Sequence, residues 1–545
     1  MANIFKPGGP PRMAHQREGL INTVKSGGVH ALLFDPGTGK TATTLDYASL
    51  LALKSPTGEA RVLVTAPLAA VDTWVTQAPV WVAEGVNVWA EALGGSIQQK
   101  AEALAARGGN PFRSTKDRRG DAPRAHGHRR SLDLAIRPAL GKKAPPARHG
   151  PDALGEDHPR LIIVSVNLDA FASRQTLKGS TRTRADLMVE AVRRYAPDLI
   201  VVDESHKIKG ATSNTSKALA RLTPLCKRRM LLTGTVMPHS PLDVFGQWRF
   251  LQPNAFGTRM ADGTSRPATL GSFRNRYAVM GGWMGKEITG FKNLDEMQEI
   301  MARNATVAKK SEVLDLPKVT SVDVHVDLSP AERRAYSAMV KDLAVQIGDG
   351  DWSSVPNPLA QRMRLRQITS GHLPDDLGRV VSLGTSKVDT IRSIVQDTLL
   401  GEDRVVIFSH FTEEIDALRK ALTVKGNTVL TISGETPSSD RIAIRRRFGS
   451  DDPARLILIA QIKTMSLAVN ELVTASHGVM GSLSEQRDDY EQAVARLDRT
   501  GQTKPVTIWR AIAPGTVDEV ILESIEKRTN LETAMLRHVA EGPDF

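Results

Sequence analysis

The sequence predicts an α/β protein with two lobes, each built on a parallel β-sheet, and a helical insertion between them. Its 545 residues exceed what one core can hold, since single hydrophobic cores stop growing near roughly 250–300 residues. Two series of short β-branched runs also alternate with helical patterns, as in βαβ units. We therefore expect a first lobe at residues 1–255, the insertion at residues 256–385 and a second lobe at residues 386–545.

The first lobe contains four runs that are apolar nearly throughout, each followed by a polar segment and a helix candidate. Strands that are buried on both faces of a parallel sheet have this composition. We expect these strands at Val62–Pro67, Leu161–Asn167, Leu199–Glu204 and Arg229–Thr235.

The second lobe repeats the same pattern after the insertion. The insertion itself is rich in helix formers with an amphipathic pattern, and we expect a linker near its middle, at residues 313–328. The strands of the second lobe are expected at Val405–His410, Val429–Ser433, Leu456–Ala460 and Val506–Ile512.

The overall composition indicates a soluble globular protein, with 41% hydrophobic and 24% charged residues. No apolar run approaches the ~20 residues that are needed to cross a bilayer, and the N-terminus lacks a signal-like stretch. The single cysteine, Cys226, excludes an internal disulfide framework and a cysteine-built zinc site. We expect a cytoplasmic protein.

The charge balance favours a polyanionic partner, most simply nucleic acid. The formal net charge is +12 and the sequence pI is about 9.7. A basic but otherwise ordinary surface is the alternative. The segment Ala105–Pro159 is rich in Arg, Lys, Gly and Pro and poor in large apolar residues, which predicts a basic loop between two strands. The loop either adds contacts to phosphates or is a solvated insertion without a function of its own.

A glycine-rich turn, "DPGTGKT", follows an apolar strand and precedes a helix candidate. A phosphate-binding loop needs glycines for tight backbone turns, a lysine for the β/γ charge and a hydroxyl for Mg²⁺. Gly37, Gly39, Lys40 and Thr41 supply these groups. The full pattern G-x-x-x-x-G-K-[ST] is not met, because Phe34 stands at its first glycine. An ordinary strand–turn–helix is the alternative.

An acidic pair closes another apolar run, in "LIVVDESHK". Phosphoryl transfer needs a metal, a positive clamp and a positioned nucleophile. Asp203 would hold Mg²⁺ and Glu204 would orient the attacking water. Two carboxylates that cap a helix are the alternative, which the nearby phosphate loop disfavours.

Two arginines, Arg496 and Arg499, lie three residues apart in "QAVARLDRTGQTKPV", on one face if the segment is helical. Such arginines can face the γ-phosphate during transfer, a contribution worth ~10³–10⁵ in rate. A pair of surface arginines is the alternative.

The order of these motifs resembles the SNF2-type branch of superfamily 2 helicases and translocases. "RMAHQREGL" is similar to the Q motif, "DPGTGKT" to motif I, "VTAPLAAVDTW" to motif Ia and "VDESHKIKG" to motif II, a DEAH-like box. "RMLLTGTVMPHSPLDVFGQWRFLQP" resembles motif III with its sequel. In the second lobe "VVIFSHF" resembles motif IV and "QAVARLDRTGQTKPVTIWRAI" motif VI. The resemblance covers nearly the whole chain. The chain carries no appended reader domains, and in this respect it is similar to phage or prokaryotic members of the family.

One motif departs from the family. Motif V is glycine-rich, whereas Ala460–His477 carries Met465, Ser466 and Ala468 in place of the glycines. The family uses this motif to couple DNA contact to the ATP site. The departure puts the coupling in doubt and leaves the hydrolytic residues intact.

The resemblance implies two RecA-like lobes that close on ATP and Mg²⁺, with Arg496 and Arg499 acting on the γ-phosphate. It also implies that Thr233 and Thr235 sense the nucleotide and link the lobes. The nucleotide would contact Gln16, Gly37, Thr38, Gly39, Lys40, Thr41 and Gln492, and the metal Thr41 and Asp203. Contacts to nucleic acid would come from Thr65, Ser165, Ser409 and Gly434.

The function that these features predict is an ATP-dependent motor that moves on or remodels duplex DNA, in a prokaryotic or phage-infected cell. Two alternatives stay open. One is a DNA-binding module with weak or uncoupled ATPase activity, which the altered motif V motivates. The other is an RNA-directed helicase of the same superfamily.

Overall fold

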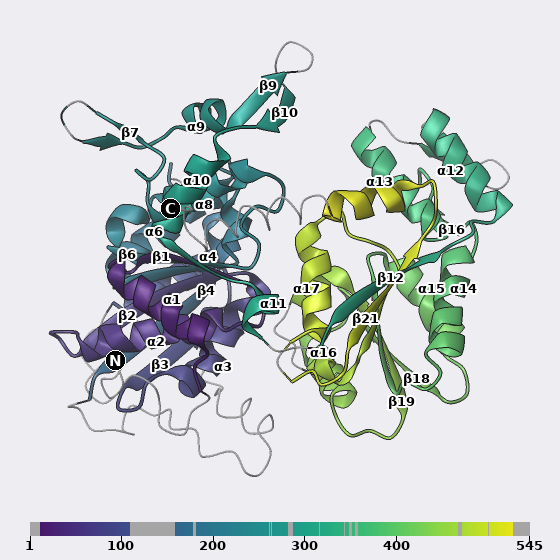
Figure 1. Cartoon of the computed structure of the whole chain (residues 1–545), viewed down its shortest axis with the longest axis horizontal. Helices are drawn as coiled ribbons and strands as arrows, with labels where there is room; N and C mark the ends of the chain where they lie inside the picture. Colours follow the sequence, from purple (N-terminus) through teal and green to yellow (C-terminus); the bar gives the residue numbers. More distant parts are fainter. Residues whose placement is uncertain are drawn as a thin grey trace.

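The computed structural model shows two lobes side by side, each with a twisted sheet between helices (Figure 1). The residues it describes are 11–108, 158–177, 181–260, 262, 264–281, 287–314, 317–342, 344–347, 351–354, 358–466, 471–499 and 501–526. The predicted basic loop falls almost entirely on residues 109–157, which lie outside the described residues.

The first lobe is built on a seven-stranded sheet in the order β11-β1-β6-β5-β2-β4-β3, and every pairing in it is parallel. The four strands predicted for this lobe are confirmed to within a few residues at their ends. The strands are β1 (Val29–Phe34), β2 (Glu59–Ala66), β3 (Asn87–Ala92), β4 (Arg160–Asn167), β5 (Leu199–Asp203), β6 (Arg228–Thr233) and β11 (Ala305–Ala308).

Two apolar cores lie on the two faces of this sheet, because successive residues of a strand point to opposite faces. Leu63 of β2 packs into one core, whereas its neighbour Val64 packs into the other. The helices α1 (Ala14–Lys25), α2 (Lys40–Leu53) and α3 (Val71–Trp81) supply side chains to the core that holds Val64. The helices α4 (Ile97–Ala106), α6 (Arg184–Tyr195), α7 (Asn214–Ala220) and α8 (Val244–Leu251) supply the core that holds Leu63.

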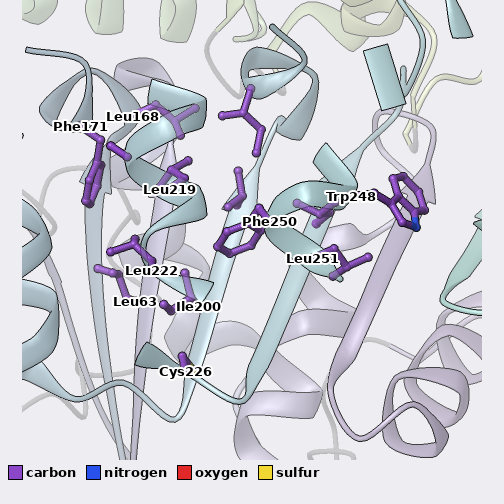
Figure 2. Close-up of a cluster of buried hydrophobic side chains, with 14 of the residues drawn as sticks. Leu63, Leu168, Phe171, Ile200, Leu219, Leu222, Cys226, Trp248, Phe250 and Leu251 are labelled. Carbon is purple, nitrogen blue, oxygen red and sulfur yellow. The ribbon is translucent and has the colours of Figure 1, made fainter. Parts of the chain in front are cut away.

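Figure 2 shows part of the core on the Leu63 face. Leu63 and Ile200 reach it from the sheet, Leu219 from α7, and Trp248 and Leu251 from α8. Burial of this kind stabilises by roughly 25 cal/mol for each Å² of apolar surface removed from water. The large apolar contact fixes where the strand ends lie, and the candidate site is built on those ends.

The second lobe has a six-stranded parallel sheet in the order β12-β21-β20-β17-β19-β18. The helices α14 (Ser386–Ser393) and α15 (Thr412–Leu422) contribute to one core, and α16 (Ser438–Phe448) and α17 (Arg487–Leu497) to the other. The four strands predicted here are confirmed. The strands are β12 (Val319–His325), β17 (Arg404–Ser409), β18 (Asn427–Ile432), β19 (Arg455–Gln461), β20 (His477–Met480) and β21 (Val506–Ile512).

The expected linker at residues 313–328 is wrong over β12. Val319–His325 is a strand at the edge of the second sheet, and it pairs in parallel with β21. Its valines are partly buried and alternate with exposed polar residues. That alternation is the pattern of an edge strand with one face on a core. The chain therefore leaves the first sheet after β11 and enters the second at β12.

Apart from β11 and β12, the described residues of the expected insertion form helices and short antiparallel hairpins, and its boundaries stay a prediction. The helices are α9 (Leu270–Tyr277), α10 (Leu294–Ala302), α11 (Lys310–Val313), α12 (Pro330–Asp342) and α13 (Pro358–Thr369). The hairpins are β7 (Thr258–Arg259) with β8 (Ser265–Arg266), β9 (Ala278–Gly281) with β10 (Glu287–Phe291), β13 (Ala344–Ile347) with β14 (Asp351–Ser354), and β15 (His372–Pro374) with β16 (Val380–Ser382). Within the described part of the chain, no helix has the length and apolarity that crossing a bilayer requires.

Candidate active site

The glycine-rich turn between β1 and α2 has the backbone of a phosphate-binding loop. Gly37 and Gly39 have φ values of +89° and +98°, a left-handed region that L side chains rarely adopt. The hydroxyl of Thr38 donates to the carbonyl of Asp35 at 2.8 Å, which closes the turn. The 14-residue helix α2 then starts at Lys40, so its N-terminal N–H groups and positive dipole end lie at the loop. An anion is the natural ligand of such a turn.

Two side chains of helix α1 contact this loop. Gln16 Nε2 donates to the carbonyl of Thr38 at 3.0 Å, and His15 Nε2 lies 2.7 Å from the same oxygen. Gln16 Oε1 accepts from the N–H of Met13 at 3.1 Å, so its amide is bonded at both ends. A Cβ at position 39 would require the Gln16 amide to move, and the positive φ of Gly39 itself favours glycine there. Adenine recognition by Gln16 stays a prediction.

Lys40 places its ammonium group at the same loop. In this structure Nζ donates to the carbonyl of Phe34 at 2.7 Å, and the charge also acts on the Asp203 carboxyl. Thr41 follows in the first turn of α2 and is partly buried. Lys40 therefore lies between the loop and the acidic pair, and the roles of both residues stay predictions.

Asp203 ends β5 and is held by two hydrogen bonds. Trp74 Nε1 donates to Oδ2 at 2.9 Å, and the N–H of Glu204 donates to Oδ1 at 3.0 Å. Burial, and then the charge of Glu204, raise the Asp203 pKa to about 6, against the opposing effects of Trp74 and Lys40. A nearby cation would relieve this cost, and carboxylate and hydroxyl oxygens are the donors that Mg²⁺ prefers. The chemistry of Asp203 therefore suits a magnesium ion, and Thr41 as a second ligand stays a prediction.

Glu204 has an unusual backbone conformation for a side chain of its size. Its φ is +49°, in the left-handed region, and residues held there cluster at functional sites. Its Oε2 lies 3.4 Å from Nδ1 of His206. Burial lowers the His206 pKa well below its ordinary value, so this imidazole is neutral. Its Nδ1 also lies 3.1 Å from the hydroxyl of Thr233, which connects motif II to motif III.

The second lobe brings its two arginines to this site. Burial, and then the charge of Arg499, lower the Arg496 pKa to about 10, whereas Glu204 of the first lobe opposes the shift. Arg496 is therefore still charged at neutral pH, and it is an electrostatic neighbour of Glu204. A Cβ on Gly37 would lie 3.7 Å from Cβ of Arg499, so this residue adjoins the phosphate loop. The structure thus brings together the predicted loop, acidic pair and arginines.

A direct hydrogen bond joins the lobes beside these groups. The hydroxyl of Thr235 donates to Glu491 Oε2 at 3.0 Å, and Arg487 Nε donates to Glu491 Oε1 at 2.7 Å. Gln492 is the next residue on α17 and is partly buried, and its nucleotide contact stays a prediction. Sequence reasoning missed roles for His15, Trp74 and Glu491. His15 and Trp74 lie inside recognised motifs, and Glu491 directly precedes motif VI.

The predicted contacts to nucleic acid stay a prediction, and the structure shows where the four residues lie. Thr65, Ser165 and Ser409 are fully buried inside β2, β4 and β17. The Thr65 hydroxyl donates to the carbonyl of Val201, and Ser409 donates to Glu414, so in this structure neither side chain reaches a phosphate. Ser165 is equally inaccessible. Of the four predicted residues, Gly434 alone is exposed.

The altered motif V lies only partly within the described residues. Residues 467–470, which include Ala468, are outside them. The described parts end β19 and form short helical turns at Ile462–Ser466 and Glu471–Thr474. The consequence of the departure for coupling stays a prediction.

A phosphate loop and an acidic pair on one parallel sheet, with arginines from a second parallel sheet beside them, define a two-lobed nucleotide-binding architecture. A model described as the SNF2-related domain matches residues 151–372, and one described as the helicase conserved C-terminal domain matches residues 386–501. The chain belongs to the SNF2-type branch of superfamily 2.

Curated relatives agree with this family. The DNA annealing helicase and endonuclease ZRANB3 of Mus musculus is 25% identical over 370 residues, 66% of this chain and 32% of that protein. The uncharacterized ATP-dependent helicase MG018 of Mycoplasma genitalium is 25% identical over 388 residues, 68% of this chain and 34% of that protein. The chain thus spans about a third of the length of these relatives.

A solved structure, the Sulfolobus solfataricus SWI2/SNF2 ATPase core in complex with dsDNA, is 19% identical in sequence. The match covers 98% of this chain and 94% of that one, with a TM-score of 0.34.

Proposed function

We propose that this chain is an ATP-dependent motor that couples ATP hydrolysis to movement on, or remodelling of, duplex DNA. The observation that carries the proposal is the meeting of two sets of groups from different lobes. Lys40 and the Asp203–Glu204 pair belong to the first lobe, and Arg496 and Arg499 reach them from the second. Hydrolysis that depends on both lobes can be coupled to their relative movement.

In this proposal each group has one task. The loop N–H groups and Lys40 bind the β- and γ-phosphates, and Glu204 orients a water for in-line attack on the γ-phosphorus. Thr41 and Asp203 would hold Mg²⁺, which supplies charge stabilisation for the transferred phosphoryl group. Arg496 and Arg499 neutralise charge as the bond to the leaving ADP oxygen breaks. ATP and water yield ADP and inorganic phosphate.

Duplex DNA is the proposed track. The net charge of +12 supports a polyanionic partner, and a relative is named as a DNA annealing helicase. A motor that must hold any sequence relies on contacts to phosphates rather than to bases. The relatives are much longer than this chain, so their further activities are not carried over.

The test is a panel of ATPase rates with no nucleic acid, duplex DNA, single-stranded DNA and RNA. The proposal predicts the highest kcat with duplex DNA. Stimulation by RNA in preference to DNA would favour the RNA-directed helicase. Salt-sensitive DNA binding without any stimulated hydrolysis would favour the DNA-binding module with weak or uncoupled activity.

A further inference from the structure

Helix α11 is tied to the phosphate loop through its backbone. The N–H of Lys310 donates to Asp35 Oδ2 at 2.8 Å, and the N–H of Asp35 donates to the carbonyl of Ala308 at 3.0 Å. Asp35 opens the "DPGTGKT" turn, and Ala308 ends β11. A displacement of the phosphate loop is therefore transmitted to the first residue of α11.

The side chain of the same lysine reaches across to the second lobe. Lys310 Nζ lies 2.7 Å from Asp498 Oδ2, and the two side chains are only 11% and 15% exposed. Asp498 follows the last residue of α17 and directly precedes Arg499. Burial lowers the Lys310 pKa, whereas Asp498 opposes that shift. An ion pair so poorly exposed is screened little by salt. In Figure 1, α11 accordingly lies between the first sheet and α17.

This ion pair is a polar contact between the C-terminal end of α17 and the first lobe. The Thr235–Glu491 hydrogen bond of 3.0 Å is another. Glu491 and Asp498 are separated by two helical turns, about 10 Å, and so lie on the same side of the helix. Two contacts at this spacing fix both the position and the tilt of α17, with Arg496 between them.

We propose that Lys310 is a positioning residue whose ion pair with Asp498 seats Arg499 at the phosphate loop and joins movements of that loop, through Asp35, to the second lobe. The inference deepens the proposed function and rests on it. It also explains the acidic residue between two arginines: Lys310 neutralises a carboxylate that would otherwise repel a triphosphate.

The experiment is a double-mutant cycle on the DNA-stimulated ATPase with Lys310→Glu, Asp498→Lys and the double exchange. Each single variant places like charges together, and we expect kcat to fall at least ~10-fold with KM for ATP within ~2-fold. The double exchange restores the pair in reverse, and we expect kcat within ~3-fold of wild type. Lys318→Glu, the same charge change at an exposed site in the same segment, should leave kcat unchanged.

Two results would overturn the inference: an unchanged kcat in Lys310→Glu, or a double variant as impaired as the worse single variant. Thermal unfolding of all variants separates misfolding from mispositioning. If a single variant is unfolded, Lys310→Met replaces it, and the same fall in kcat at unchanged KM is expected. Lys310→Arg, which keeps the charge, should retain most of the wild-type kcat.

A second readout separates this inference from the proposed function. Cys226 is buried, so dyes can be attached to cysteines introduced at the exposed Lys54 and Lys420, one in each lobe. If wild type hydrolyses no ATP, the proposed function fails. The distance between the two dyes then tests whether the Lys310–Asp498 ion pair positions the second lobe. The pair predicts an altered distance in both single variants and the wild-type distance in the double variant. Equal distances in all four proteins would overturn it.

Discussion

The indole of Trp74 donates its Nε1–H to Asp203 Oδ2 at 2.9 Å, and both side chains are buried. The bond joins α3, which follows β2, to the carboxyl end of β5. Together with the N–H of Glu204 on the other oxygen, it fixes the rotation of the carboxylate. Each oxygen keeps a further lone pair for a cation. Trp74 thus orients the group that would hold Mg²⁺.

Trp74→Phe should therefore weaken magnesium-dependent hydrolysis more than it weakens the fold. Loss of a partner that orients a metal ligand typically costs ~10–100-fold in activity, whereas one hydrogen bond is worth about 1 kcal/mol of stability. Titration of ATPase rate against Mg²⁺ checks this expectation. Trp81→Phe is the matched control, since its indole donates instead to Gln77 in the same helix. Equal Mg²⁺ dependence in both variants would contradict the assignment.

Glu204→Gln should nearly abolish turnover while ATP and DNA still bind. The amide keeps the size of the side chain but cannot polarise the water, and loss of a general base costs ~10²–10⁴-fold in rate. Single-turnover hydrolysis with duplex DNA measures the effect, and binding of a fluorescent ATP analogue is the control. Lys40→Ala should lose the binding of ATP as well. Activity that persists in Glu204→Gln would remove the role given to this residue.

Arg496→Lys should show that the guanidinium shape matters as well as its charge. Both side chains are protonated at neutral pH, but lysine lacks the planar fork that matches phosphate oxygens. We expect kcat to fall by ~10³ with little change in ATP affinity, the lower end of what such arginines contribute. Arg419→Lys, at a half-exposed site on α15, is the control. A fall in affinity at constant kcat would assign Arg496 to binding alone.

Most of the strands that sequence reasoning found are buried on both faces, although the edge strand β18 was also found and the interior strand β20 was missed. β2, β4, β5 and β6 are apolar nearly throughout, because each lies inside the first sheet with a core on either side. β3 lies at the sheet edge and is mostly only partly buried, so its residues carry no such signal. β12 was missed for the same reason, since it also lies at a sheet edge. The fold class was predictable, whereas the edge strands β3 and β12 were not.

The candidate site also has one part that the sequence predicted and one part that it did not. The phosphate loop and the acidic pair are local, and their residue types follow from their chemistry. The Trp74–Asp203 and Thr235–Glu491 bonds join residues that are 129 and 256 positions apart, so they depend on how the sheets and lobes pack. The sequence pattern did not reveal that Thr65 is buried within a central strand, where its hydroxyl donates to the carbonyl of Val201.

A buried ion pair anchors the segment that carries Gln16. Arg12 donates twice to Asp46, at 2.7 Å for each bond, and its guanidinium lies 4.3 Å from the ring centroid of Trp81. Arg12→Met should cost about 3–5 kcal/mol of unfolding free energy, because it leaves a buried carboxylate without a partner. Arg12→Met with Asp46→Leu should recover much of this loss. Denaturant unfolding tests both, and equal stability of the two variants would contradict the account.

His30 makes stability depend on pH. It is buried on β1, with Nε2 2.8 Å from the Thr306 hydroxyl on β11, and burial lowers its pKa to about 4. In the unfolded chain the pKa is near 6.5. Between these values the unfolded state holds a proton that the folded state lacks, so acidification favours unfolding. The contribution is fully present above pH 6.5 and is lost as the pH falls toward 4, by up to about 3 kcal/mol.

His30→Gln removes this titration. The variant therefore measures how much His30 contributes to the pH dependence of the unfolding free energy. Other groups titrate in the same range, so the informative quantity is the difference in unfolding free energy between wild type and variant. At pH 7 wild type should be the more stable, because the variant disturbs a packed site. As the pH falls to 4.5 the difference should shrink or reverse, since only wild type must accept the proton on unfolding. His325→Gln, at an exposed position of β12, is the matched control. Parallel curves for wild type and His30→Gln would mean that His30 is accessible to protons in the folded protein.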